Sequence, residues 1–275
     1  MVRLLPIPRF SRRPAAFRLN RNLAISTSCD KEPFYGAPAM EPSLQDASTR
    51  LSTFMHMATQ AILDPTRADC VAAVGELTGT HTLKQLYECL QSSHSGRRIL
   101  EERPVVSKAT IPYKRLLDEA RTLAENGNAD STGITFGQSY GRFLLQHGFD
   151  PDGRDEVKYV EDQDLAYVML RYRQCHDFWH ALTGLPPTVL GELALKHVEL
   201  YQTGLPLAAL SLVGGRWSLN DTERATLDTI LVPWARRVGQ STPYGTLLTV
   251  YYEEEWDTPL VDLQSQLGLE PAPFA

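Results

Sequence analysis

Apolar residues recur at helical spacing along most of this 275-residue chain, beginning near Ala47. Steps of three and four residues place such side chains on one face of a helix. The first run of this kind consists of Leu51, Phe54, Met55, Ala58 and Ile62. No stretch alternates apolar and polar residues convincingly enough to indicate a strand, and we find no internal repeat. The pattern predicts an all-α fold, a single-domain multi-helix bundle.

Proline, glycine and asparagine residues divide the helical pattern into segments. The expected helices span residues 47–63, 66–77, 82–90, 113–124, 137–146, 164–183, 188–200, 222–238, 243–256 and 260–267. Between them we expect extended or loop-like chain at 103–112, a polar turn at 150–156 and a glycine turn at 214–215. Pro233, inside one of these segments, is expected to cause at most a kink.

The stretch 164–200 carries the most informative pattern, DLAYVMLRYRQCHDFWHALTGLPPTVLGELALKHVEL. Before Gly184 its apolar residues lie on every side of a helical wheel, which is typical of a buried helix. The same helix contains His176, Asp177 and His180. Imidazoles and carboxylates are costly to bury unless they are hydrogen-bonded, paired or bound to a metal. We therefore hypothesise a metal site made by two consecutive helices.

The spacing of the two histidines suits chelation. His176 and His180 are four residues apart, so their side chains lie one above the other on the same helical face. Gly184 and the pair 186–187, both prolines, predict a short connection that folds the next helix back along the first. Glu192, one turn into that second helix, can then face the histidines.

Spacing alone leaves alternatives open at each of these positions. The two histidines could instead be hydrogen-bonded core residues. Asp177 lies about 100° round the helix from His176, so it could reach the edge of the site or orient a ligand. Glu192 is four residues before Lys196, the favourable order for a helical ion pair, and lies opposite the apolar stripe. From spacing alone, a surface role for Glu192 is slightly favoured.

Other polar residues near this stretch allow similar choices. Arg171 and Arg173 lie in an otherwise apolar helix and need buried partners. Because Arg173 shares the histidine face, it could hold an anionic substrate or pair with a nearby carboxylate. His197 lies on the apolar stripe of its helix and is interpreted as a core residue. The glutamate triplet 253–255 is most simply a solvated face.

Composition narrows the class of protein and of metal. A formal net charge of −6 argues against nucleic-acid binding, which needs a basic face. The four cysteines form no C-x-x-C pair, so neither a disulfide framework nor a thiolate zinc site is expected. Two imidazoles with carboxylates suit catalytic Zn²⁺, or Fe²⁺ in a facial triad. The longest apolar segment, 205–213, is about half a membrane span, so membrane contact without crossing is expected.

The N-terminal region differs in composition from the rest of the chain. Residues 1–29 contain six arginines and no acidic residue, together with several serines. This composition is typical of a mitochondrial presequence; a disordered basic tail is the alternative. Residues 30–46 contain three prolines and are interpreted as a linker. The expected organisation is therefore a presequence over 1–29, a linker over 30–46 and an α-helical domain over 47–275.

The motif H-D-x-x-H followed by eleven residues and Glu resembles that of the Coq4 family of ubiquinone-biosynthesis proteins; here it comprises His176, Asp177, His180 and Glu192. Further similar segments are TFGQSYGRFL (135–144), DLAYVMLRYRQCHDFWHALTG (164–184), LGELALKHVELYQTGLPL (190–207) and VYYEEEWDTPLVDLQSQLG (250–268). The resemblance covers roughly residues 47–270, and the four motif positions show no departure from the family pattern.

The resemblance implies an α-helical, zinc-binding protein, peripheral on the matrix side of the mitochondrial inner membrane. It implies partners in a multisubunit complex of other ubiquinone-biosynthesis proteins, and a homo-oligomer is compatible with it. The implied activity is that of a lyase, the C1-decarboxylation of 4-hydroxy-3-methoxy-5-polyprenylbenzoate to 2-methoxy-6-polyprenylphenol. The four motif residues carry over as zinc ligands and catalytic residues, which promotes Glu192 above its spacing-based interpretation.

The chemistry that this implies can be stated as a hypothesis. The metal would bind the substrate carboxylate as a Lewis acid, and Asp177 or Glu192 would relay the proton that C1 receives. The polyprenyl tail needs an apolar groove, for which 205–213 is a candidate, although this segment could equally pack in the core.

Two other functions compete with the decarboxylase. In the first, the protein is a non-catalytic scaffold for the biosynthetic complex, and its metal only braces two helices. In the second, it is a metal-dependent hydrolase resembling HD-type phosphohydrolases. The hydrolase ranks last because the remaining five histidines form no companion motif.

Overall fold

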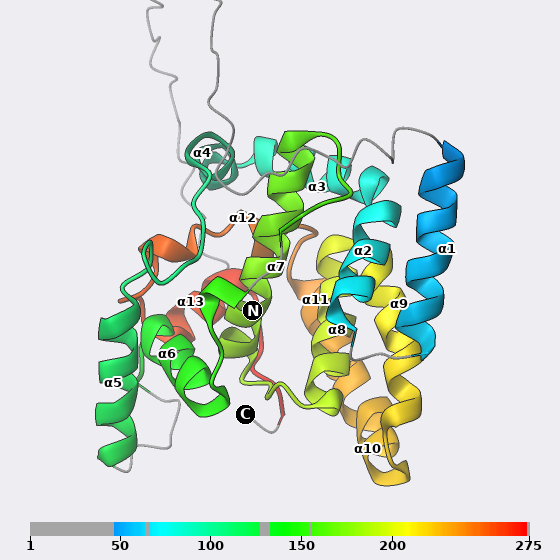
Figure 1. Ribbon diagram of the computed structural model, residues 1–275. Coiled ribbons are helices and arrows are strands. Elements are labelled where there is room, and N and C mark those ends of the chain that lie inside the picture. The colour runs from blue at the N-terminus through cyan, green and yellow to red at the C-terminus, as the bar shows by residue number, and fades with distance from the viewer. Residues whose placement is uncertain (1–46, 64–66, 127–132, 154–155, 274–275) are drawn as a thin grey trace, which may run out of the picture. The chain divides into compact units, whose positions relative to one another are not determined.

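Helix α7 (Gln163–Thr183) is the longest described helix and passes through the middle of the bundle (Figure 1). Most of its residues are buried, as the all-round apolar pattern predicts. The Asp162 side chain caps its N-terminus by accepting hydrogen bonds from the backbone N–H groups of Asp164 and Leu165. Gly184, with φ of 72°, ends the helix in the left-handed conformation that favours glycine.

Helix α8 (Val189–Thr203) returns antiparallel to α7 after a short connection. The Thr188 hydroxyl caps α8 by accepting a hydrogen bond from the Gly191 N–H at 3.2 Å. A Cβ at Gly191 would lie 2.0 Å from the Pro186 carbonyl oxygen, so only glycine allows this close approach. The predicted helix pair is therefore confirmed, and its tight connection places the start of α8 beside the end of α7.

The remaining helices pack around this pair. Helix α6 (Phe136–His147) and helix α3 (Thr80–Ser92) contact α7, and α5 (Tyr113–Glu125) packs on α6. Helices α9 (Pro206–Gly215) and α11 (Val232–Ser241) contact α8. Helix α2 (Ala68–Thr78) lies between α9 and α1 (Ala47–Leu63) and contacts both of them.

An aromatic cluster fixes α6 and the C-terminal segment against α7. The Phe178 ring centroid lies 4.7 Å from that of Tyr140 and 5.0 Å from that of Tyr252. The Phe136 and Trp256 rings complete the cluster and stack with their centroids 5.6 Å apart. Large buried rings of this kind contribute much of the apolar area that stabilises a fold.

The computed structural model describes residues 47–63, 67–126, 133–153 and 156–273, all of which belong to one compact unit spanning 35–275. Over these ranges the regular structure is helical, with one isolated bridge between Thr135 and Pro259 and no strand. This confirms the all-α, single-domain prediction. The expected presequence and linker, 1–29 and 30–46, lie outside the described residues. No described helix is both long and apolar enough to span a membrane.

Two helical segments were not expected from the pattern. Helix α4 (His94–Glu102) begins directly after α3, because the Ser93 hydroxyl accepts a hydrogen bond from the Gly96 N–H at 2.9 Å and caps a new helix. Glycines 214–215 were expected to form a turn but instead complete the last turn of α9.

The expected helix 222–238 is continuous but contains a wider turn. Helix α10 (Asp221–Thr226) passes through a π-helical turn, Leu227–Leu231, into α11. Within this turn the Val232 N–H donates to the Leu227 carbonyl, five residues back. Pro233 has no N–H to donate to the preceding turn, which accounts for the change of register.

The prediction of a helix over 243–256 is wrong. The chain forms only the short helix α12 (Thr246–Thr249) and a 3₁₀ turn, Tyr252–Glu254. The Ser95 hydroxyl donates to the Thr249 carbonyl at 2.7 Å, and the Arg171 guanidinium donates to the Val250 carbonyl at 3.0 Å. Side chains distant in sequence thus occupy the carbonyl groups that a continuing helix would use.

The interpretation of 253–255 as a solvated face is also wrong for its first residue. Glu253 forms a bidentate ion pair with Arg171, whose side chain is fully buried. Glu254 pairs with Arg98 at 2.7 Å at the surface. The predicted need of Arg171 for a buried partner is confirmed, and Glu253 is that partner.

Candidate metal centre

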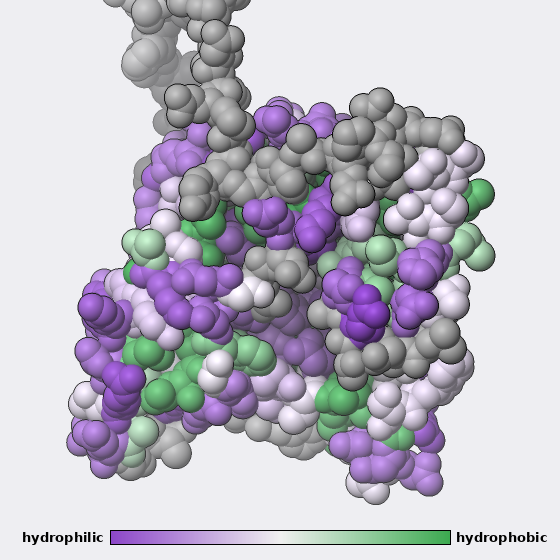
Figure 2. Space-filling view, viewed as in Figure 1, coloured by the Kyte–Doolittle hydropathy of each residue, from purple (hydrophilic) through white to green (hydrophobic). Residues whose placement is uncertain are grey.

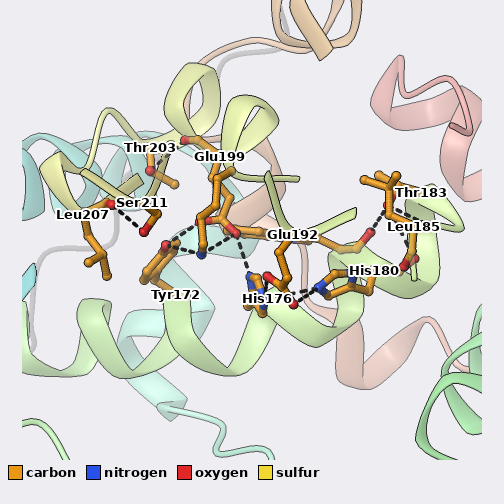
Figure 3. Close-up of polar contacts among 12 residues, drawn as sticks. Tyr172, His176, His180, Thr183, Leu185, Glu192, Glu199, Thr203, Leu207 and Ser211 are labelled. Atoms are coloured by element: carbon orange, nitrogen blue, oxygen red, sulfur yellow. Dashed lines mark hydrogen bonds and ion pairs between the residues drawn. The ribbon is translucent and has the colours of Figure 1, made fainter. Parts of the chain in front are cut away.

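Three side chains converge between α7 and α8 (Figure 3): His176, His180 and Glu192. One ligand atom from each lies within 4.8 Å of the others. Glu192 Oε1 is 3.0 Å from His180 Nε2, and Glu192 Oε2 is 3.3 Å from His176 Nε2. The two Nε2 atoms are themselves 3.3 Å apart. The helix pair thus brings together three of the four predicted ligands.

The opposite edge of each imidazole ring is held by an acceptor. His176 Nδ1 lies 2.6 Å from Glu199 Oε1, and His180 Nδ1 lies 2.9 Å from the Leu185 carbonyl oxygen. Burial opposes ionisation of Glu199, but Lys196 and His176 outweigh it and hold the pKa of this carboxyl at about 2. Because neither acceptor can donate, both Nδ1 atoms must carry the hydrogen.

This arrangement leaves an excess of electron pairs at the point of convergence. A neutral imidazole with hydrogen on Nδ1 presents a lone pair at Nε2. The ionised Glu192 carboxylate, the third member of the group, likewise offers only acceptor oxygens. Two nitrogen lone pairs and a carboxylate therefore face one another. A cation bound among them would satisfy all three groups.

The three side chains differ in their exposure to solvent. His180 is buried and the His176 side chain is 12% exposed, whereas the Glu192 side chain is 36% exposed. The centre is therefore anchored in the core by its histidines and open to solvent at its carboxylate. Sites with three protein ligands and an open side are typical of catalytic metal ions.

The model of the Coq4 family, described as "Coenzyme Q (ubiquinone) biosynthesis protein Coq4", matches residues 44–273. The chain belongs to the Coq4 family. The mitochondrial ubiquinone biosynthesis protein COQ4 homolog of Rattus norvegicus is 38% identical over 78% of this chain and 76% of its own length. The corresponding protein of Aspergillus terreus is 41% identical, over 78% of this chain and 70% of its own length.

A solved structure shows the same fold at greater evolutionary distance. The crystal structure of a putative ubiquinone biosynthesis protein from Nostoc punctiforme superposes with a TM-score of 0.56, covering 80% of this chain and 96% of that one. The sequences are 21% identical, so this likeness concerns the fold alone.

Within the Coq4 motif, Asp177 differs from the other three residues. It is buried beside His176 on α7, but it does not belong to the group whose ligand atoms converge. Its assignment as a ligand therefore stays a prediction from the family motif.

The expected ion pair of Glu192 with Lys196 is wrong, although the Glu192 side chain is partly exposed, as its spacing indicated. Lys196 Nζ instead contacts both oxygens of Glu199, at 2.8 and 3.0 Å. Glu199 is a member of the centre that the sequence analysis did not identify. Its signal was available, because Glu192 and Glu199 are seven residues apart and so share the α8 face that looks toward α7.

Two other polar residues of this region also have partners. Arg173 pairs with the buried Glu76 at 2.5 Å, which is the ion-pair alternative foreseen for it. The Glu76 carboxylate also accepts hydrogen bonds from the backbone N–H groups of Lys158 and Tyr159. His197 is half-buried, its Nδ1 lies 2.8 Å from the Leu193 carbonyl oxygen, and burial lowers its pKa. His197 therefore lies apart from the metal centre.

A cavity of about 280 Å³ borders the centre at His180. Helix α6 contributes Phe143, whose ring stacks on the His180 imidazole with centroids 5.2 Å apart. Arg142, Gln146 and other residues of α6, α7 and α13 (Leu260–Leu267) line the rest. The cavity thus combines apolar walls with a few polar groups beside a candidate ligand, as small-molecule sites commonly do.

Proposed function

We propose that this protein acts in mitochondrial ubiquinone biosynthesis as a metal-dependent lyase. Its substrate would be 4-hydroxy-3-methoxy-5-polyprenylbenzoate, which loses its C1 carboxylate as CO₂ and gains a proton to give 2-methoxy-6-polyprenylphenol. The observation that carries the proposal is the convergence of His176, His180 and Glu192, with each Nδ1 already bound to an acceptor. Family membership supports the pathway, and the donor set supports a metal ion.

The residues present suit Zn²⁺, with Fe²⁺ as the other candidate. His176 and His180 would hold the ion through Nε2, and Glu192 through its carboxylate, with Asp177 as the proposed fourth ligand. A bound Zn²⁺ would supply Lewis acidity toward the substrate carboxylate. Loss of CO₂ needs no change of metal oxidation state, so a redox-inert ion suffices for this reaction.

The protein side chains have separate tasks in this mechanism. The buried histidines keep the centre rigid, because their Nδ1 partners fix the ring orientations. Glu192 is the ligand with access to solvent, so it can take up a proton and deliver it to C1 as CO₂ departs. Asp177 is the alternative proton relay. The aromatic ring of the substrate would occupy the cavity beside His180.

Metal analysis with reconstitution tests this proposal. The purified full chain is freed of metal by chelation, reloaded with Zn²⁺ or Fe²⁺, and assayed for CO₂ release from a short-chain prenylated substrate. Turnover is expected only after reloading, and the His180→Ala variant is expected to lose both the metal and turnover. Persistent decarboxylation by the metal-free protein would contradict the mechanism.

A non-catalytic scaffold is the second candidate. It is favoured by the buried contacts that tie α7 to α8 at the centre, because a metal there would also brace the two helices. In that case, loss of the metal would impair assembly with other ubiquinone-biosynthesis proteins while leaving decarboxylation by the remaining system unchanged.

We also propose peripheral attachment to the inner membrane, on the matrix side. The segment 205–213 is divided between core and surface: Leu205 and Ala208 are buried, whereas Leu210 and Val213 are 50% and 63% exposed. The nearby Trp217 is 78% exposed. Helix α1 also carries exposed apolar side chains, and Figure 2 shows hydrophobic residues in green along the edge over α1. Exposed apolar side chains of this kind favour contact with lipid.

A further inference from the structure

A fully buried carboxylate lies behind the metal-facing histidine. Glu199 is 0% exposed and accepts three side-chain donors: His176 Nδ1 at 2.6 Å, Lys196 Nζ at 2.8 and 3.0 Å, and the Tyr172 hydroxyl. In Figure 3, Glu199 and Tyr172 lie to the left of His176, and Glu192 and His180 lie to its right. We call Glu199, Lys196 and Tyr172 the Glu199 network.

The network makes the two histidines unequal. The partner of His176 is a carboxylate, whereas that of His180 is the neutral carbonyl of Leu185. A carboxylate hydrogen-bonded to Nδ1–H increases electron density on the ring and so makes Nε2 a better ligand. His176 is therefore the stronger donor of the pair, although it is the less buried of the two.

Lys196 controls how much of this negative charge reaches the centre. Its ammonium contacts both Glu199 oxygens and also donates to the Tyr172 hydroxyl at 3.3 Å. The charges of Lys196 and Glu199 cancel, so a bound divalent ion would keep its own positive charge for an anionic substrate. Without Lys196, the same carboxylate would add a full negative charge next to the ligand.

We propose that Glu199 is a positioning residue of the metal centre, and that Lys196 limits the strength with which the centre binds its ion. This inference rests on the proposed function, because it requires a metal at His176, His180 and Glu192. The alternative is that the Glu199 network only holds α7 against α8. The two roles differ in measurable ways, because a purely structural contact would change stability without a specific effect on metal affinity.

Zn²⁺ affinity of the metal-free full chain, measured by competition with a chromophoric chelator, tests the proposal. Glu199→Gln keeps the shape but removes the charge, and is expected to weaken Zn²⁺ binding roughly 10–100-fold. Because Glu199→Gln leaves Lys196 buried and unpaired, the double variant Glu199→Gln/Lys196→Met is the safer protein. It is expected to retain the helical circular dichroism of the parent. It should still bind Zn²⁺ more weakly than the parent, but with a smaller loss than Glu199→Gln, because the positive charge of Lys196 is removed as well.

Lys196→Met alone distinguishes charge control from packing. It leaves Glu199 uncompensated, so Zn²⁺ binding is expected to become tighter, roughly tenfold, by attraction to one further unit charge. The matched control is Arg171→Met/Glu253→Gln, which removes another buried ion pair of α7 that does not touch the centre. This control is expected to lower the thermal midpoint without changing Zn²⁺ affinity.

Two results would overturn the inference. One is a Zn²⁺ affinity of the Glu199→Gln/Lys196→Met variant equal to that of the parent. The other is a loss of affinity in Lys196→Met as large as in Glu199→Gln, which would reduce the network to packing. If the parent chain binds Zn²⁺ and the His180→Ala variant does not, either result would leave the proposed metal centre intact. A parent chain that binds neither Zn²⁺ nor Fe²⁺ would overturn both.

Discussion

At the scale of single residues, Glu192 has the most to do in the proposed reaction, because it would be both a metal ligand and the proton carrier nearest to solvent. Glu192→Gln keeps a similar shape but loses the charge and the capacity to transfer a proton. We expect turnover to fall by roughly 10²–10⁴, as for removal of a general acid. Measurement of CO₂ release checks this, with replacement of the exposed Glu88 on α3 by Gln as the matched control. Equal turnover in the two variants would remove Glu192 from the mechanism.

Cys175 provides a residue-scale prediction about pH. Burial raises the pKa of this thiol to about 12, well above its value in an unfolded chain, about 8.5. The neutral thiol therefore stabilises the fold fully below the unfolded pKa, and this contribution is lost as pH rises toward the folded pKa. Cys175→Ala should make the free energy of unfolding, from urea titrations, decline less steeply above about pH 9. The partly buried Cys89→Ala should have a smaller effect; an equal effect would contradict this explanation.

At the scale of elements, the sequence predicted best where a helix is specified by its own residues. The all-round apolar pattern identified α7 as buried, and the prolines and glycine after it predicted the tight return into α8. Prediction failed where contacts with residues from other parts of the chain, or competition between neighbouring side chains, determine the pairing. Glu192 was predicted to form an ion pair with Lys196, because the sequence could not show that Lys196 would pair with Glu199 instead. Asp177 stays with the family motif, since geometry does not bring it into the group.

The error over 243–256 leads to a prediction about the element that replaced the expected helix. Arg171 ties this segment to α7 through Glu253 and the Val250 carbonyl. Arg171→Met leaves Glu253 as an unpaired, mostly buried charge, which should lower the free energy of unfolding by about 3–5 kcal/mol. The double variant Arg171→Met/Glu253→Gln should recover part of this loss. Urea titration of both variants checks the pairing, and equal losses would contradict it.

The cavity formed jointly by α6, α7 and α13 gives a prediction about substrate binding. Gln146 lines it from the exposed end of α6, so its replacement should disturb the core little. Gln146→Trp should obstruct the cavity and raise KM for the prenylated substrate by at least about tenfold, while leaving Zn²⁺ affinity unchanged. The exposed Leu145→Trp, on the same helix but outside the lining, is the matched control. An unchanged KM in Gln146→Trp would place the substrate elsewhere.

At the scale of the whole molecule, the centre and the exposed apolar surface would serve the same substrate in the proposed function. A polyprenylated benzoate would reside in lipid, whereas its carboxylate would have to reach the histidines between α7 and α8. Helix α9 joins the two requirements, since it packs on α8 and presents Leu210 and Val213 to solvent. The exposed apolar side chains therefore lie on a helix that packs against the one that supplies Glu192.

Because these exposed side chains lie apart from the metal ligands, membrane attachment and turnover should be separable by mutation. The triple variant Leu210→Ser, Val213→Ser, Trp217→Ser removes exposed apolar area without touching the metal ligands. In cosedimentation with vesicles of mixed neutral and anionic lipid, it should bind at least about tenfold more weakly, because each lost side chain removes roughly 1.5–3 kcal/mol of transfer energy when fully inserted. Zn²⁺ affinity and turnover of a detergent-dispersed substrate should remain at parental levels, whereas turnover of substrate presented in vesicles should fall. Substitution of the exposed Val261 to Ser on α13 is the control, since it lies on a helix that packs against α6 rather than α8. Undiminished vesicle binding by the triple variant would show that another surface of the protein meets the membrane.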